Sequence, residues 1–171
     1  SITDGQIFLQ TELFNSGVRP AVDSGLSVSR VGSAAQTKAI KSVSGSLKLD
    51  LAQYNEMLSF AQFGSDLDSA TQATINHGAR LQELLKQPQY SPLSMVEQVL
   101  SLFAAKNGYL KTIAVKDVAK FEKYLHKYFK NNGQDVIKTI DDEKIISKET
   151  SARLFELMDA CLKEFKLVNG D

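Results

Sequence analysis

Helical periodicity runs through most of this chain and restricts its fold more than any other feature. From Ser33 to about Val168, apolar residues recur at spacings of three and four, which places them on one face of successive helices. Gly45 and Pro88 interrupt the pattern, as residues that weaken or end helices do. We therefore expect a mainly α protein, built as a helical bundle with short connecting loops.

The apolar stripes and the polar punctuation between them predict where individual helices begin and end. We expect a first helix over residues 34–43, a helix capped by Ser91 that stops at residues 107–108, and a last helix capped by Ser147. Residues 135–140 are expected to form only a short helical turn before an acidic loop. The second helix is expected to bury one stripe: Leu47, Leu51, Tyr54, Leu58 and Ala61.

Composition argues against several classes of function. The chain has 20 basic and 20 acidic residues and no basic run, so it lacks the charge pattern of a nucleic-acid-binding protein. Cys161 is the only cysteine and sits among apolar neighbours, which predicts a buried side chain and no internal disulfide. His77 and His126 have no ligand-like spacing, so we expect no metal site. No apolar run is long enough to span a bilayer.

The most informative site candidate is Arg30, within residues 25–36. No acidic residue occurs between Asp23 and Asp50, and alternating small and apolar residues predict a short strand that ends at the arginine. A guanidinium without a nearby partner suits a phosphate or a carboxylate from elsewhere. From the single residue, pairing with an acid distant in sequence, or plain exposure to solvent, remains open.

The neighbouring residues carry a resemblance to a known family. Five runs occur in one order, at residues 1–9, 17–21, 25–36, 61–68 and 84–92, and together they closely resemble the α subunit of F-type ATP synthase. The resemblance is specific to about Tyr109 and looser beyond it. The β subunit of the same ring does not carry Ser-Val-Ser-Arg-Val-Gly at this place, so the α subunit matches better.

The resemblance implies a division of the chain into two parts. Residues 1–32 would be the C-terminal edge of a nucleotide-binding domain, and residues 33–171 would be the helical C-terminal domain. The sequence has no Gly-x-x-x-x-Gly-Lys-Ser/Thr loop and no initiator methionine, so we expect it to be the C-terminal portion of a longer protein. The segment before Ser27 should then lack sheet partners, and we expect it to be poorly ordered or paired with another chain.

The resemblance also assigns roles near the strand. Arg30 matches the arginine that reaches across the subunit interface to the nucleotide bound by the neighbouring β subunit, an arginine finger. Ser27 matches a serine linked to activity, which we interpret as positioning the strand, although a hydroxyl with no role is equally compatible. Ser1 lies where the family brings a serine near the interface.

A second set of matches concerns the family's own, non-catalytic nucleotide site. Arg19, Pro20, Gln87 and Gln89 match positions that line its adenine pocket. An arginine plane and a proline ring offer flat surfaces to a base, and amide side chains can donate and accept at its edge. Each of these residues alone would more commonly be an ordinary loop residue.

A third match is a loop between helices that, in the family, lies near the rotating central shaft. Ser65 or Asp66 could equally serve as a helix N-cap. The sequence departs from the usual family pattern at Lys38, Asn55 and residues 142–143. The shaft-facing loop consists of Phe63, Gly64, Ser65, Asp66, Leu67 and Asp68.

The family's biology then follows as expectation. The protein would belong to a proton-driven ATP synthase, inactive alone, with β subunits in an α3β3 hexamer, the γ shaft and a peripheral stalk as partners. ATP or ADP with Mg would bind only in the assembled complex. The complex would sit on the cytoplasmic face of a bacterial inner membrane, or on the matrix face of the mitochondrial one. The alternative is a free-standing helical interaction module derived from such an ATPase.

Overall fold

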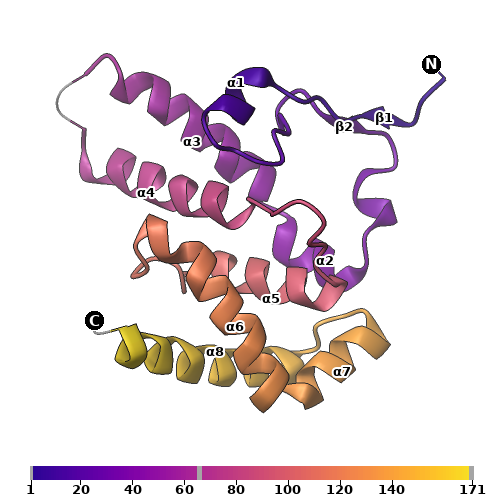
Figure 1. Ribbon diagram of the computed structural model, residues 1–171. Helices are drawn as coiled ribbons and strands as arrows, with labels where there is room; N and C mark the ends of the chain where they lie inside the picture. The colour runs from indigo at the N-terminus through magenta and orange to yellow at the C-terminus, as the bar shows by residue number, and fades with distance from the viewer. Residues whose placement is uncertain (1, 65–66, 170–171) are drawn as a thin grey trace. The chain divides into compact units, whose positions relative to one another are not determined.

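The expectation of a mainly α protein is confirmed (Figure 1). The structure, a computed structural model, describes residues 2–64 and 67–169, so Ser1, Ser65 and Asp66 of the predicted sites lie outside the described residues. The protein forms two compact units. The first unit consists of Ser1–Ala35 and Gly45–Pro92, and the second unit consists of Gln36–Ser44 and Leu93–Asp171.

The N-terminal segment of the first unit folds back on itself. Strand β1 (Gly5–Gln6) pairs antiparallel with β2 (Val28–Ser29), with Gly5 opposite Ser29. A β-carbon on Gly5 would lie 2.3 Å from the carbonyl oxygen of Val28, so this pairing requires glycine. A further antiparallel bridge joins Leu9 to Val22 on either side of helix α1 (Thr11–Asn15). We expected this segment to lack strand partners within the protein. Instead, its two strands pair with each other.

That segment nevertheless leaves many large apolar side chains exposed. They lie on the short ladder, on α1 and in the stretches beside them. A single two-stranded ladder buries little apolar area, so the exposure follows from its size. The exposed residues here are Ile2, Ile7, Phe8, Leu9, Phe14, Leu26, Val28 and Val31.

The rest of the first unit is a pair of neighbouring helices, α3 (Leu47–Ala61) and α4 (Ser69–Leu84). Asp68 is the N-cap of α4, and its carboxylate accepts a hydrogen bond from Thr71 N at 2.6 Å. Of the stripe predicted for α3, only Tyr54 is fully buried, since α3 packs mainly against one other helix. Because α3 and α4 group with the N-terminal segment, the compact units do not coincide with the predicted domains 1–32 and 33–171.

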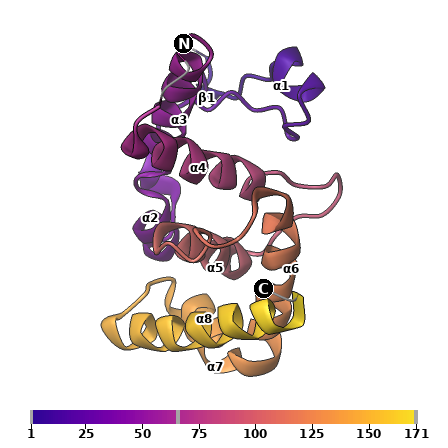
Figure 2. The same cartoon turned by 90° about the vertical axis from the view of Figure 1, so that its left-hand side faces the viewer.

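The second unit is a bundle of helices (Figure 2) that buries an apolar core. Its helices are α2 (Lys38–Ser44), α5 (Met95–Lys106), α6 (Val118–Asn132), α7 (Gln134–Glu143) and α8 (Lys148–Asn169). The largest side chains that are almost completely buried come from α5 to α8. They include Val99, Leu100, Val118, Phe121, Leu125, Phe129, Ile140, Leu154, Met158 and Cys161.

Helix ends in the second unit show where local capping decides the boundary. The predicted cap Ser91 is wrong, because α5 starts after Ser94: Ser94 Oγ accepts from Glu97 N at 3.2 Å, and the Glu97 carboxylate accepts from Ser94 N at 2.9 Å. The predicted cap Ser147 is confirmed, since its hydroxyl accepts from Thr150 N at 3.1 Å.

Two further boundaries differ from expectation. The first helix begins at Lys38 rather than residue 34, because Thr37 Oγ1 accepts from Ile40 N and closes the first turn there. Helix α7 continues to Glu143, so the acidic stretch is its last turn and not a loop. Within residues 2–64 and 67–169, no helix has the length and apolar character needed to cross a membrane.

Candidate functional site

Arg30 lies directly after β2, on a turn whose main chain is held at several points. Its N–H donates to the carbonyl of Asp4 at 2.8 Å, and Ser29 Oγ accepts from Gly32 N at 3.0 Å. Gly32 has φ 54°, in the left-handed region that glycine adopts without strain. The Arg30 side chain is exposed, and among the described residues no hydrogen bond or ion pair reaches its guanidinium. The N–H groups of the guanidinium are therefore free to donate to an anionic group of another molecule.

Ser27 links the strand to the turn that precedes it. Its hydroxyl accepts from Phe8 N at 3.1 Å and donates to the carbonyl of Asp23, which leaves it no free hydrogen for another role. Lys48 Nζ donates to the carbonyl of Ser27 at 3.2 Å. Ser27 is half-buried, and these contacts are those of a residue that positions the strand.

Asp23 organises the same turn. One carboxylate oxygen accepts from Gly25 N and from Leu26 N, both at 2.9 Å, and the other accepts from the Gln10 amide at 3.2 Å. The backbone hydrogen bond from Leu26, with smaller help from Gln10 and Gly25, lowers the pKa of the Asp23 carboxyl below its ordinary value. The turn before Arg30 is therefore built around a carboxylate.

The residues predicted for an adenine pocket come from two segments that the structure joins. Gln87 N donates to the carbonyl of Arg19 at 2.9 Å, next to a cis peptide bond between Arg19 and Pro20. The Arg19 guanidinium lies 4.0 Å above the centre of the Phe14 ring, and its Nε donates to the Phe14 carbonyl at 3.4 Å. Arg19 and Gln87 are thus neighbours, and the Arg19 guanidinium stacks on an aromatic ring.

The two glutamines lie in an irregular stretch after α4. The Gln87 side-chain amide donates to the carbonyl of Ser91 at 2.8 Å, and the Gln89 carbonyl accepts weakly from Ser91 Oγ at 3.4 Å. Arg19, Pro20, Gln87 and Gln89 are all exposed. The structure places them on one surface of the first unit without enclosing a cavity among them.

The predicted shaft-facing loop joins α3 to α4. Phe63 is 91% exposed, an unusual position for a phenylalanine. Asp68, and not Ser65 or Asp66, is the residue seen to cap α4. Ser65 and Asp66 lie outside the described residues, so the comparison with the prediction applies to Phe63, Gly64 and residues 67–68.

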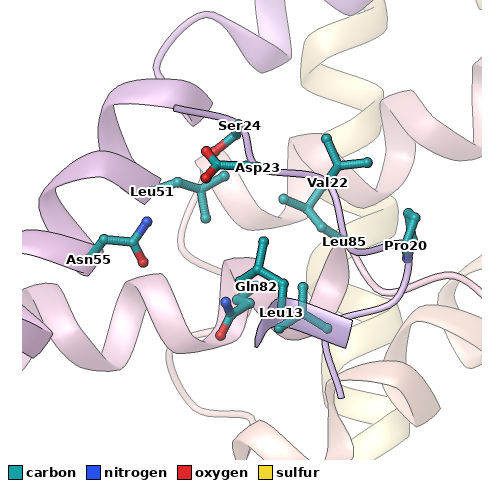
Figure 3. Close-up of a pocket in the computed structure, with 10 residues that line it drawn as sticks. Leu13, Pro20, Val22, Asp23, Ser24, Leu51, Asn55, Gln82 and Leu85 are labelled. Carbon is teal, nitrogen blue, oxygen red and sulfur yellow. The ribbon is translucent and has the colours of Figure 1, made fainter. Parts of the chain in front are cut away.

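The first unit contains a pocket that the sequence did not reveal (Figure 3). Its volume is about 310 Å³, and its walls come from helices α3 and α4 on one side and from the N-terminal segment on the other. The lining residues are Leu13, Val18, Pro20, Val22, Asp23, Ser24, Leu51, Asn55, Gln82 and Leu85.

A buried polar cluster in the second unit resembles a nucleophile and its base but cannot act as one. Ser101 Oγ donates to the Glu122 carboxylate at 2.7 Å, so its proton does not point to His126. His126 Nε2 lies 2.9 Å from Ser101 Oγ and 3.2 Å from the carbonyl oxygen of Glu97. Because a carbonyl oxygen can only accept a hydrogen bond, Nε2 carries the hydrogen and donates it. Ser101 is 4% exposed, and the cluster joins α5 to α6.

Cys161 is fully buried on α8, as predicted. Burial is the main cause that raises the pKa of its thiol, to about 12, so the thiolate that nucleophilic chemistry needs is not formed near neutral pH. Among the residues that the structure describes, no group of three or more His, Cys, Asp or Glu side chains is placed to hold a metal ion.

Comparison with protein families gives one match that covers most of the sequence. Residues 36–161 match the family described as "ATP synthase alpha/beta chain, C terminal domain". The matched region spans α2 to most of α8, so it includes the hairpin of α3 and α4 and the core of the second unit. It begins after Arg30 and after the strand pair.

Proposed function

Because this protein belongs to the family of C-terminal domains of ATP synthase α and β subunits, we propose that it is the C-terminal part of the α subunit, the regulatory and non-catalytic member of the ring. The family includes both ring subunits, so the choice of α rests on sequence. The supporting residues are Ser27 to Gly32, which read Ser-Val-Ser-Arg-Val-Gly, a run that the β subunit does not carry at this place.

In this proposal Arg30 is the arginine finger for a nucleotide bound by a neighbouring β subunit. The supporting observation is that its main chain is held by Asp4 while its guanidinium is exposed and unpaired among the described residues. A planar fork of N–H donors can bind two phosphoryl oxygens as their charge develops. An arginine finger raises the rate of phosphoryl transfer by a factor of about 10³ to 10⁵, which corresponds to roughly 4 to 7 kcal/mol of transition-state stabilisation.

The remaining expectations extend the same proposal. Arg19, Pro20, Gln87 and Gln89 would contact the adenine of a non-catalytic ATP or ADP with Mg, while the phosphates are held by residues outside this sequence. Residues 63–68 would face the γ shaft, and the peripheral stalk would complete the assembly. The complex would be peripheral on the cytoplasmic face of a bacterial inner membrane or on the matrix face of the mitochondrial one.

The proposal is tested by Arg30→Lys in a complete α subunit assembled with β and γ. Lysine keeps the charge but loses the fork, so ATP turnover should fall by about 100-fold or more while nucleotide affinity changes little. Arg80→Lys on α4 is the matched control, with turnover expected to be unchanged. Normal turnover would make Arg30 a structural residue, and a complex that fails to assemble would make it an interface residue.

The second candidate is a helical interaction module that works without the rest of an ATPase. The exposed apolar side chains of the N-terminal ladder favour it, since such residues suit contact with another protein. The sequence encoded upstream of residue 1 separates the two candidates. A Gly-x-x-x-x-Gly-Lys-Ser/Thr loop there supports the α subunit, and its absence supports the module.

A further inference from the structure

The pocket in the first unit combines apolar walls with two amide side chains. Leu51 and Leu85 lie on the helical side, and Leu13 and Val22 lie on the side of the N-terminal segment (Figure 3). Its volume of about 310 Å³ is at the lower end of the range for small-molecule sites. The shape and the apolar lining therefore suit one small ring rather than a nucleotide.

The amides of Asn55 and Gln82 and the hydroxyl of Ser24 are the uncharged hydrogen-bonding groups of the lining. The Asn55 side chain is exposed, and within the described residues it makes no hydrogen bond. The Gln82 oxygen accepts only a long bond of 3.5 Å from the Tyr54 hydroxyl, which leaves its NH₂ group available. Together they can donate to and accept from a partner that carries both functions, such as another carboxamide.

The charge of the pocket selects against anions. Asp23 is the charged residue in the lining, and its carboxylate is held in the ionised form by the backbone of Gly25 and Leu26. A negatively charged ligand would be repelled at this short range, whereas an uncharged one would not. A carboxylate and a carboxamide of the same shape should therefore bind differently.

We propose that this pocket binds a small, uncharged aromatic carboxamide, and that its occupant holds the turn carrying Ser27 and Arg30. The second part rests on the proposed function of Arg30. The connection is short: Asp23 lines the pocket, and its carbonyl accepts both from Ser27 N at 3.0 Å and from Ser27 Oγ. A ligand that restrains Asp23 thus restrains the residue three positions before Arg30, and the pocket becomes an effector site for that arginine.

Benzamide is the probe for the first part, followed by amide NMR shifts of the ¹⁵N-labelled 171-residue protein. Saturable shifts are expected at the side-chain amides of Asn55 and Gln82, with affinity in the millimolar range for so small a ligand. Benzoate should bind at least about tenfold more weakly, because Asp23 repels it. No saturable shift, or equal affinity for benzamide and benzoate, would overturn the site.

Variants separate the pocket from non-specific binding. Asn55→Leu should weaken benzamide about tenfold or more, since a lost polar partner is costly in a small site, whereas Asn131→Leu, at an exposed position of α6, should have no effect. If Asn55→Leu does not fold, Leu51→Phe fills the space instead and should abolish binding. Unchanged binding in a folded variant, or shifts confined to the second unit, would contradict the proposal.

The coupling to Arg30 has its own readout. Benzamide should shift the backbone amides of Leu26 and Ser27 and slow their hydrogen exchange, and Asn55→Leu should remove both effects. Binding without any change at these two amides would overturn the effector role. Because the experiment uses neither β subunits nor nucleotide, its failure leaves the arginine-finger proposal standing, and failure of that proposal leaves the pocket test unaffected.

Discussion

The ring of Tyr54 lies directly against the backbone of Gly78. A β-carbon on Gly78 would come within 2.3 Å of Tyr54 Cβ and Cγ, closer than any real contact of that kind. The absence of a side chain at this one position lets α3 and α4 approach, and it makes Tyr54 the single fully buried residue of α3. The helical hairpin of the first unit depends on this contact.

Gly78→Ala should therefore destabilise the first unit, although alanine favours a helix. The clash with an atom close to the α3 backbone should cost about 1 to 3 kcal/mol, after a gain of about 1 kcal/mol from helix propensity is included. Urea unfolding and amide exchange in α3 and α4 measure the change. Ala73→Gly, on the exposed face of α4, reports the propensity effect alone. A more stable Gly78→Ala protein would show that the helices can separate without cost.

The helices of the second unit were predictable because their stripes are strong and their cores are shared by several partners. Phe121, Leu125 and Phe129 recur at helical spacing, and all three are buried. The stripe predicted for α3 lies on the covered side of the helix, but only Tyr54 is fully buried, and Leu51, which lines the pocket, and Leu58 are half-buried. Periodicity indicates which side of a helix is apolar, but it does not indicate how much of the protein will cover that side.

Glu97 ties the start of α5 to α6 through charge. The ion pair with Lys130 at 2.9 Å, and then the backbone of Ser94, lower the pKa of Glu97 from 4.5 to about 2. A depressed pKa in the folded state means stability that is present above pH 4.5 and is lost as the pH falls from 4.5 to 2. Acid therefore removes this contribution.

Glu97→Gln tests whether the Glu97 carboxylate stabilises the protein above pH 4.5 and stops doing so in acid. At pH 7 the substitution should cost about 1 to 2 kcal/mol, because glutamine keeps the hydrogen bond to Ser94 but loses the charge. The difference from the unsubstituted protein should shrink as the pH falls from 4.5 toward 2, and it should vanish only below pH 2, where Glu97 itself becomes neutral. Urea unfolding across this pH range measures it, with Glu149→Gln, at an exposed position of α8, as a control. A difference that is constant with pH would contradict the assignment.

Candidate site residues could be named from the sequence because family motifs lie in short runs, and their roles stay predictions. Arg30 and Ser27 belong to one run of six residues, and Arg19 and Gln87, which come from two separate runs, are joined by a backbone hydrogen bond. The pocket beside Asn55 was not anticipated, because its lining comes from four separate segments and carries no motif. Such a cavity exists only after α3, α4 and the N-terminal turn are assembled.

The 171-residue protein alone should not bind Mg-ATP tightly. Arg19 and Gln87 present a base-binding surface, but the sequence has no phosphate loop, and phosphate contacts dominate nucleotide affinity. Isothermal titration calorimetry should show no binding as tight as micromolar. Micromolar affinity would mean that these residues hold the phosphates by a route that the structure does not suggest.

A transition-state analogue separates a catalytic role of Arg30 from a structural one. In the assembled complex, Arg30→Ala should weaken binding of ADP–aluminium fluoride at the catalytic sites by about 100-fold or more, because the analogue carries the charge that the guanidinium stabilises. Affinity for ADP alone should change by less than about threefold, since ADP lacks that group. Equal losses for both ligands, or no loss for the analogue, would contradict the assignment of Arg30 as an arginine finger.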